Sequence, residues 1–115
     1  MVTKLLSQMS RIELLEEMIR CQDKGKEALE EGMLSEYQVL EKRYYLAKSY
    51  TIDPSTITLG ITYGIENDTN LFVVNELRGV MAYGHAIGQE EEIAYPIGML
   101  IEITFPKDHS SPKTS

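Results

Sequence analysis

The sequence predicts an α+β protein in which an N-terminal antiparallel helical hairpin precedes a small five-stranded SH3-like β-barrel. Apolar residues recur at helical spacing as far as Asp53-Pro54, and beyond it they alternate in short runs that glycine interrupts. The 115 residues can bury one modest core. We assign residues 1–54 to the hairpin and 55–105 to the barrel, and we expect the polar tail 106–115 to be disordered.

The first helix is predicted to begin at a capping box and to end before a glycine. Ser10 can accept a hydrogen bond from the backbone of Glu13, whose side chain can reach back. The helix should run to about Glu31, with Gly32 as the residue that terminates it. Its core-facing stripe is expected to consist of Leu14, Met18, Cys21, Gly25 and Ala28.

The second helix should run from about Leu34 to Ile52, because Pro54 disfavours helical backbone in the residue before it. A further capping box is expected at Ser35 to Gln38. The short connection makes the hairpin antiparallel and sets Gly25 against Leu40 and Cys21 against Tyr44. The stripe that faces the first helix should comprise Tyr37, Leu40, Tyr44, Ala47 and Thr51.

A second apolar stripe is left over on the hairpin, although one helix–helix interface needs only one. We expect it to pack on the barrel or on a second copy of the chain, with a homodimer through the hairpin as the simplest assembly. Its members are Ile12, Leu15, Ile19, Val39, Leu46 and Tyr50.

The residues after Ser55 have the period-two pattern of strands. Leu59, Ile61, Tyr63 and Ile65 should share one face of the first strand. Gly84 is expected to mark a bulge or bend, and Pro96 should place its strand on an edge. The further strands are predicted at 71–77, 80–87, 93–97 and 99–105, with loops at 66–70 and 88–91. Five strands in so short a segment favour an SH3-like barrel over an OB-fold.

The charge is unevenly distributed, and its distribution limits the partners. The net charge is −7, and residues 56–105 carry one basic residue, Arg78, against seven acidic ones. We therefore do not expect the barrel to bind nucleic acid, because that requires Lys and Arg opposite the phosphates. No apolar run approaches the length of a membrane span, and one cysteine cannot form an internal disulfide. These features fit a cytoplasmic protein without membrane partners.

Two sets of residues are candidate interaction surfaces. The first could receive a protein or peptide partner, and a basic partner would suit the acidic loop 90–92. We prefer, however, the reading in which the rings form the core of the barrel. This first set consists of Tyr63, Tyr83, His85 and Tyr95. The second is a basic face on the hairpin. It could bind nucleic acid, but we prefer to interpret it as a solvated surface with i,i+4 ion pairs. It consists of Arg20, Lys24, Lys42 and Arg43.

No catalytic, cofactor or metal site is predicted. The glycines do not form a phosphate-binding motif, and no Ser/His/Asp arrangement is visible. His85 beside the acidic loop lacks the fixed ligand spacing of a zinc site, and Cys21 lies in an apolar stripe where a thiol is inert. An enzyme is therefore not expected, and a metal or small-molecule sensor lacks candidate ligands.

Three stretches of the chain carry a family resemblance, namely Gly32 to Pro54, Gly60 to His85 and Glu91 to Leu100. Together they resemble the YfhH-like family of uncharacterised proteins from spore-forming Gram-positive bacteria and their relatives, and the resemblance spans roughly residues 9–105. It implies a helical hairpin followed by an SH3-like barrel, and it supplies no catalytic residues. Members have been described as transcriptional regulators. We expect a non-enzymatic interaction or regulatory module, with a nucleic-acid-associated regulator as the alternative.

Overall fold

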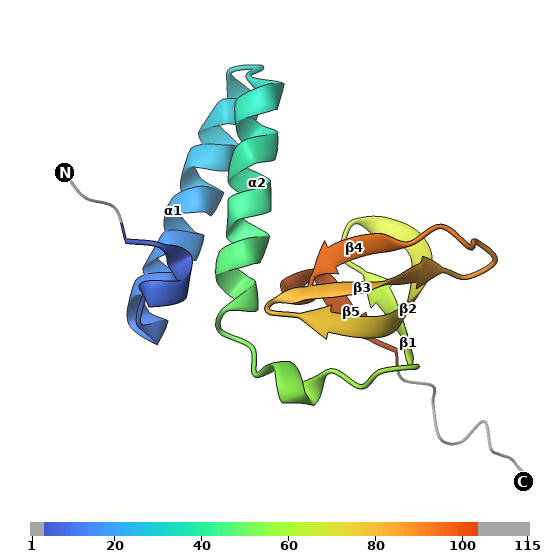
Figure 1. Ribbon diagram of the computed structural model, residues 1–115. Helices are drawn as coiled ribbons and strands as arrows, with labels where there is room; N and C mark the ends of the chain where they lie inside the picture. The colour runs from blue at the N-terminus through green and yellow to red at the C-terminus, as the bar shows by residue number, and fades with distance from the viewer. Residues whose placement is uncertain (1–3, 104–115) are drawn as a thin grey trace, which may run out of the picture.

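The computed structural model describes residues 4–103, and it shows two helices followed by a five-stranded antiparallel sheet (Figure 1). This confirms the predicted α+β class and the order of its two parts. The predicted disordered tail, 106–115, lies outside the described residues. The helical elements are η1 (Leu6–Gln8), α1 (Arg11–Glu30), α2 (Leu34–Ser49), η2 (Pro54–Thr56) and η3 (Ile97–Met99). The strands are β1 (Thr62–Ile65), β2 (Asp68–Arg78), β3 (Met81–Ala86), β4 (Ile93–Pro96) and β5 (Leu100–Glu102).

The ends of α1 follow the sequence closely. Ser10 Oγ accepts from the Glu13 backbone N–H at 3.2 Å, and the Glu13 carboxylate accepts from the Ser10 N–H at 2.9 Å, which is the predicted capping box. Gly32 has a φ of +74°, and the next residue, Met33, donates back to Ala28 O at 2.8 Å. The predicted capping box at Ser35 is wrong. Because this turn leads directly into α2, Met33 is already the N-cap and Ser35 lies inside the first turn.

The two helices pack closely where α1 carries its small residues. Leu14, Cys21, Gly25 and Ala28 of the predicted stripe are buried. A Cβ atom on Gly25 would lie 3.5 Å from Tyr37 Cδ1 and 4.0 Å from Leu40 Cβ. The expected contact between Gly25 and Leu40 is therefore confirmed.

The buried residues of α2 agree with the predicted stripe only at Ala47. They are Tyr45, Ala47 and Ser49, whereas Tyr44 is only half-buried. The reason is the position of α2, which has α1 on one side and the sheet on the other (Figure 1). A helix between two layers buries two faces, and a single-stripe prediction finds only one of them.

The sheet has the strand order β4-β3-β2-β1-β5. Pro96 correctly indicated that β4 is an edge strand. The predicted loop at 66–70 is shorter than expected, because β2 begins at Asp68 and only Glu66 and Asn67 form the turn. Between the described residues the strand pairs form an open sheet with β4 and β5 at its edges. The structure thus shows the five strands without the closure of a barrel.

Gly84 was predicted to mark a bulge or bend, but the bulge lies in the neighbouring strand, and Gly84 instead permits a close approach between the strands. The register shift lies in β2, between Val74 and Glu76, opposite Gly84 in β3. A Cβ on Gly84 would collide with the carbonyl oxygen of Val73 and would lie 3.1 Å from Phe72 Cζ. Only glycine allows this close approach of the two strands.

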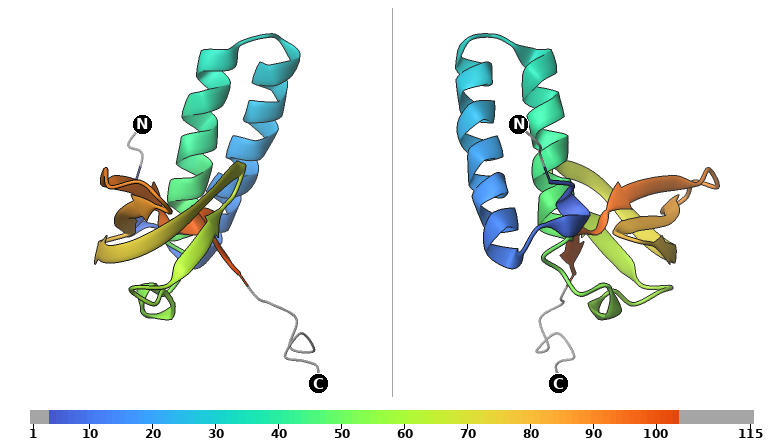
Figure 2. Two further views of the ribbon diagram at one scale, coloured as in Figure 1. Left: turned by 90° about the vertical axis from the view of Figure 1, so that its right-hand side faces the viewer. Right: turned by 60° about the vertical axis from the view of Figure 1, so that its left-hand side comes forward.

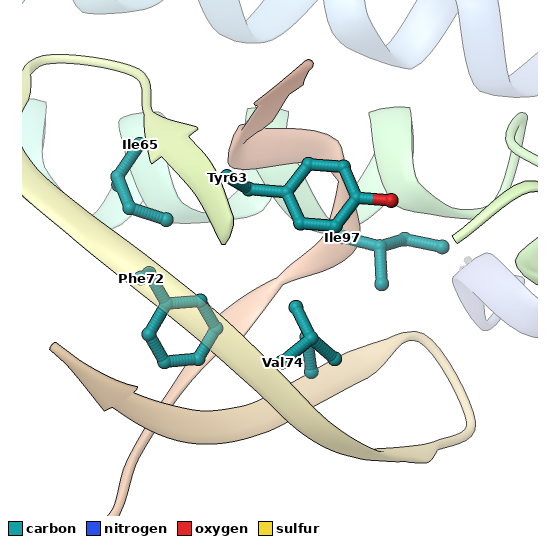
Figure 3. Close-up of a cluster of buried hydrophobic side chains, with 6 residues drawn as sticks. Tyr63, Ile65, Phe72, Val74 and Ile97 are labelled. Atoms are coloured by element: carbon teal, nitrogen blue, oxygen red, sulfur yellow. The ribbon is translucent and has the colours of Figure 1, made fainter. Parts of the chain in front are cut away.

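One core lies on the inner face of the curved sheet (Figure 3). It comprises Tyr63, Ile65, Phe72, Val74, Ala82 and Ile97. Leu59 and Ile61, expected on the same face as Tyr63, are exposed because β1 begins only at Thr62. The sheet adjoins the lower half of α2 through η3, and the upper half of the hairpin extends beyond it (Figure 2).

Candidate functional site

The outer face of α1 carries a row of large apolar side chains that the rest of the described chain leaves uncovered. Ile12, Leu15 and Ile19 are 69%, 40% and 57% exposed. Their i, i+3, i+7 spacing places them on one stripe of the helix. The sheet lies beyond α2, on the opposite side of the hairpin (Figure 1). We call these three residues the α1 row.

The α2 members of the same leftover stripe have a different environment. Leu46 and Tyr50 line a cavity of about 500 Å³ together with Leu5 and Leu6 of the N-terminal segment. Tyr50 is 40% exposed and Val39 is 68% exposed. The N-terminal segment thus adjoins the stripe on α2, whereas the α1 row has no such neighbour among residues 4–103.

The four residues of the predicted partner surface do not lie together. Tyr63 is 6% exposed, and its hydroxyl accepts from the Thr58 N–H at 3.0 Å, so it belongs to the core. Tyr95 packs edge-on against the buried ring of Phe72, with ring centroids 5.1 Å apart. For Tyr63 the structure therefore agrees with the preferred reading of a core ring, because β1 turns this residue towards the inner face.

The other two residues, Tyr83 and His85, lie on the opposite face of β3 from the buried Ala82. The guanidinium of Arg78 lies 4.1 Å from the centre of the Tyr83 ring. His85 Nδ1 is 3.1 Å from the side-chain amide nitrogen of Asn75. Arg78 thus already supplies the Tyr83 ring with a cation, and only Tyr83 and His85 remain as a shared surface.

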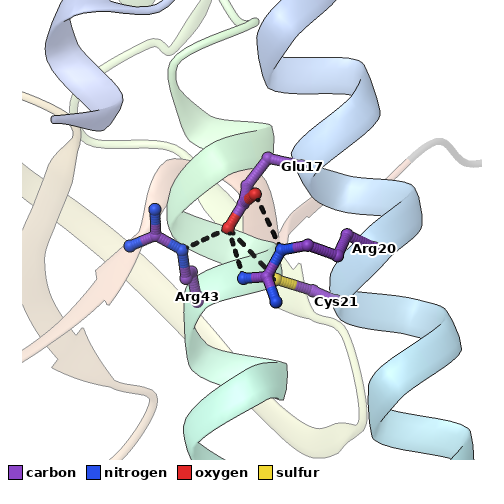
Figure 4. Close-up of polar contacts among 4 residues, drawn as sticks. All are labelled: Glu17, Arg20, Cys21 and Arg43. Carbon is purple, nitrogen blue, oxygen red and sulfur yellow. Dashed lines mark hydrogen bonds and ion pairs between the residues drawn. The ribbon is translucent and has the colours of Figure 1, made fainter. Parts of the chain in front are cut away.

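The predicted basic face is largely neutralised by acidic neighbours. Arg20 donates to both carboxylate oxygens of Glu17, at 3.0 and 2.7 Å, and Arg43 of α2 donates to the same carboxylate (Figure 4). These bonds, that of Arg20 above all, lower the pKa of Glu17 from 4.5 to about 2. Lys24 lies 3.9 Å from Glu27, and Lys42 is exposed. The surface is salt-bridged, as preferred, but the pairs within α1 have i,i+3 spacing where i,i+4 was expected, and Arg43 pairs between the two helices.

Cys21 is a buried core thiol next to this ion pair. Its Sγ lies 3.9 Å from Glu17 Oε2, and it is 2% exposed. Burial, with the Glu17 charge second, raises the pKa of the Cys21 thiol. A thiol that is protonated and inaccessible is a poor nucleophile.

Sequence reasoning missed a groove between α2 and the sheet. Tyr45, at its centre, is 6% exposed, and its hydroxyl accepts from the Asn67 side-chain amide at 3.0 Å. Asn67 occupies the β1–β2 turn with a φ of +66°. Tyr45 falls outside the stripe that was predicted to face α1. The leftover apolar stripe was the sequence signal for a second packed face, and its member Leu46 lines this groove together with Tyr45.

Among residues 4–103, no group of three or more His, Cys, Asp or Glu side chains is placed to hold a metal ion. Neither of the two described α-helices has the length and apolar character needed to cross a bilayer.

Comparison with known proteins places this arrangement among proteins without an assigned activity. Residues 4–101 match the model of a family described as a protein of unknown function, DUF1811. The chain is also similar to the uncharacterised protein YfhH of Bacillus subtilis (strain 168). The two are 35% identical over 100 residues, which cover 86% of this chain and 96% of that protein.

Proposed function

The chain belongs to the YfhH-like DUF1811 family of unknown function, and from this premise we propose that it is a non-enzymatic protein-interaction module that pairs with a second copy of itself through α1. We place this module in the cytoplasm, where its lone thiol, Cys21, would stay reduced. In the finer description of the fold, we propose that the sheet is an SH3-like barrel left open, with η3 joining β4 to β5.

The observation that carries the proposal is the exposure of the α1 row. Exposing three large apolar side chains on one stripe of a charged helix to water costs free energy. Contact with the same row of a second copy would bury that apolar surface. Gln22 and Lys26 continue the stripe towards the α1–α2 turn with polar side chains. Leu29, which is 50% exposed, resumes the stripe beyond them. The contact is therefore centred on the first half of α1, where the apolar row is continuous, and a twofold axis there would let both copies contribute the same patch.

The alternative of a nucleic-acid-associated regulator has less support. Two of the four residues of its basic face, Arg20 and Arg43, are bound to Glu17, and a third, Lys24, lies beside Glu27. Releasing the two arginines to phosphates would leave the Glu17 carboxylate without its partners. We therefore propose a protein as the partner.

The proposal is tested by light scattering coupled to size-exclusion chromatography at high micromolar concentration. The wild-type protein should have the mass of a dimer, and Ile12→Glu with Ile19→Glu should have the mass of a monomer with an unchanged helical circular dichroism spectrum. Val39→Glu is the matched control, because Val39 is 68% exposed on the other helix, and it should remain dimeric. A monomeric wild type, or a dimer that survives the double substitution, would refute the proposal.

A further inference from the structure

The groove between α2 and the sheet is a second candidate surface, separate from the α1 row. It encloses a cavity of about 640 Å³, within the size range of ligand-binding clefts. One wall is the face of α2 around Tyr45 and Leu46, and the other comes from β3, β4 and η3. The β1–β2 turn closes one end through the hydrogen bond between Asn67 and Tyr45.

The wall formed by β3, β4 and η3 is apolar, and we call it the floor of the groove. Pro96 is buried, and Met81, Ala94 and Met99 are half-buried beside it. Leu46 of α2 is half-buried on the opposite wall. Two methionines in such a floor give it flexible side chains that can adjust to different apolar groups.

The rim of the groove is acidic. Glu41 of α2, Glu66 of the β1–β2 turn and Asp68 at the start of β2 line it. Lys42 is the one basic residue among the described lining residues. The Lys48 ammonium lies 3.4 Å from Glu66 and compensates part of that charge. The sheet segment behind the rim is itself strongly acidic, so the surrounding field favours a cation.

We propose that this groove binds a cationic peptide segment of a partner protein, with an aliphatic side chain on the floor and lysine or arginine side chains on the rim. Charge complementarity selects this occupant, since an acidic rim repels nucleic acid and acidic peptides. The groove lies between α2 and the sheet, whereas the α1 row lies on the outer face of α1. The test of the groove is therefore independent of the oligomeric state.

The probe is a fluorescein-labelled five-residue peptide of alternating lysine and leucine, titrated with the protein and followed by anisotropy. Two comparison peptides separate the contribution of the acidic rim from that of the apolar floor. One has glutamate in place of lysine, and the other has serine in place of leucine. We expect binding of the lysine–leucine peptide, weaker binding of the lysine–serine peptide, and none of the glutamate peptide. Equal binding of the first two would refute the apolar floor as part of the site.

Site-directed variants locate the binding. Glu41→Gln with Asp68→Asn removes two rim charges and keeps an acceptor for Tyr37 and for the Asn70 N–H. It gives up the 3.5 Å hydrogen bond that Asp68 accepts from the Tyr95 hydroxyl. It should weaken binding about fivefold or more, as expected for two partly exposed charges. Glu90→Gln with Glu91→Gln makes the same charge change in the acidic loop outside the groove and should have little effect. An equal loss in both pairs, or a wild type that does not bind the probe, would overturn the proposal.

Discussion

A buried hydrogen bond between Ser49 of α2 and Gly98 of η3 links the hairpin to the sheet. The Ser49 hydroxyl donates to Tyr45 O at 2.7 Å and accepts from the Gly98 N–H at 2.8 Å, and Ser49 is fully buried. A Cβ on Gly98 would lie 2.8 Å from that same Tyr45 carbonyl oxygen. The two residues are 49 positions apart in the chain, so this contact depends on the whole fold.

Replacing Ser49 by alanine should destabilise the protein by about 1–3 kcal/mol, because the Gly98 N–H would be left buried and unpaired. Urea unfolding followed by circular dichroism measures the loss. Ser35→Ala is the control, since Ser35 is exposed in the first turn of the same helix, and it should change stability by less than about 0.5 kcal/mol. Equal effects of the two substitutions would contradict a special role for Ser49.

Small and large substitutions at Gly25 should change the free energy of unfolding in opposite directions. A Cβ there meets Tyr37 and Leu40 at ordinary van der Waals distances, so Gly25→Ala should gain up to about 1 kcal/mol of helix stability. Gly25→Leu should overpack the interface and cost about 1–3 kcal/mol. Denaturant unfolding of both variants is the measurement. A neutral Gly25→Leu would mean that the helices separate easily at this level.

The elements that local rules determine were predictable from the sequence. The capping box at Ser10, the turn at Gly32 and the edge position of Pro96 each depend on a few neighbouring residues. What the sequence did not reveal depends on contacts distant in the chain. Tyr45 and Ser49 are buried because the sheet covers a second face of α2, and neither residue lies on a predicted stripe. The groove follows from that same packing. The burial of Tyr63, in contrast, agrees with the preferred reading of its ring as core.

The ion pair at Glu17 predicts a pH dependence of stability. Because folding lowers the pKa of Glu17 from 4.5 to about 2, its contribution is fully present above about pH 4.5 and is lost as the pH falls towards 2. The difference in unfolding free energy between wild type and Glu17→Gln should therefore be largest near neutral pH and vanish near pH 2. Glu16→Gln, on the exposed side of α1, is the control and should show a small difference throughout. A Glu17→Gln difference that does not change with pH would contradict the ionic role.

Nucleic-acid binding should be weak, and Glu17 should control it. With Arg20 and Arg43 bound to that carboxylate, we expect a labelled DNA duplex to bind no more tightly than about 100 µM at physiological salt, in the non-specific range. Glu17→Gln frees both guanidinium groups, so it should strengthen binding at low salt more than Glu16→Gln, which changes the net charge equally. Fluorescence anisotropy at two salt concentrations measures both effects. Tight binding by the wild type that resists salt would instead favour the nucleic-acid-associated regulator, and loss of that binding in Lys42→Glu would assign it to the hairpin.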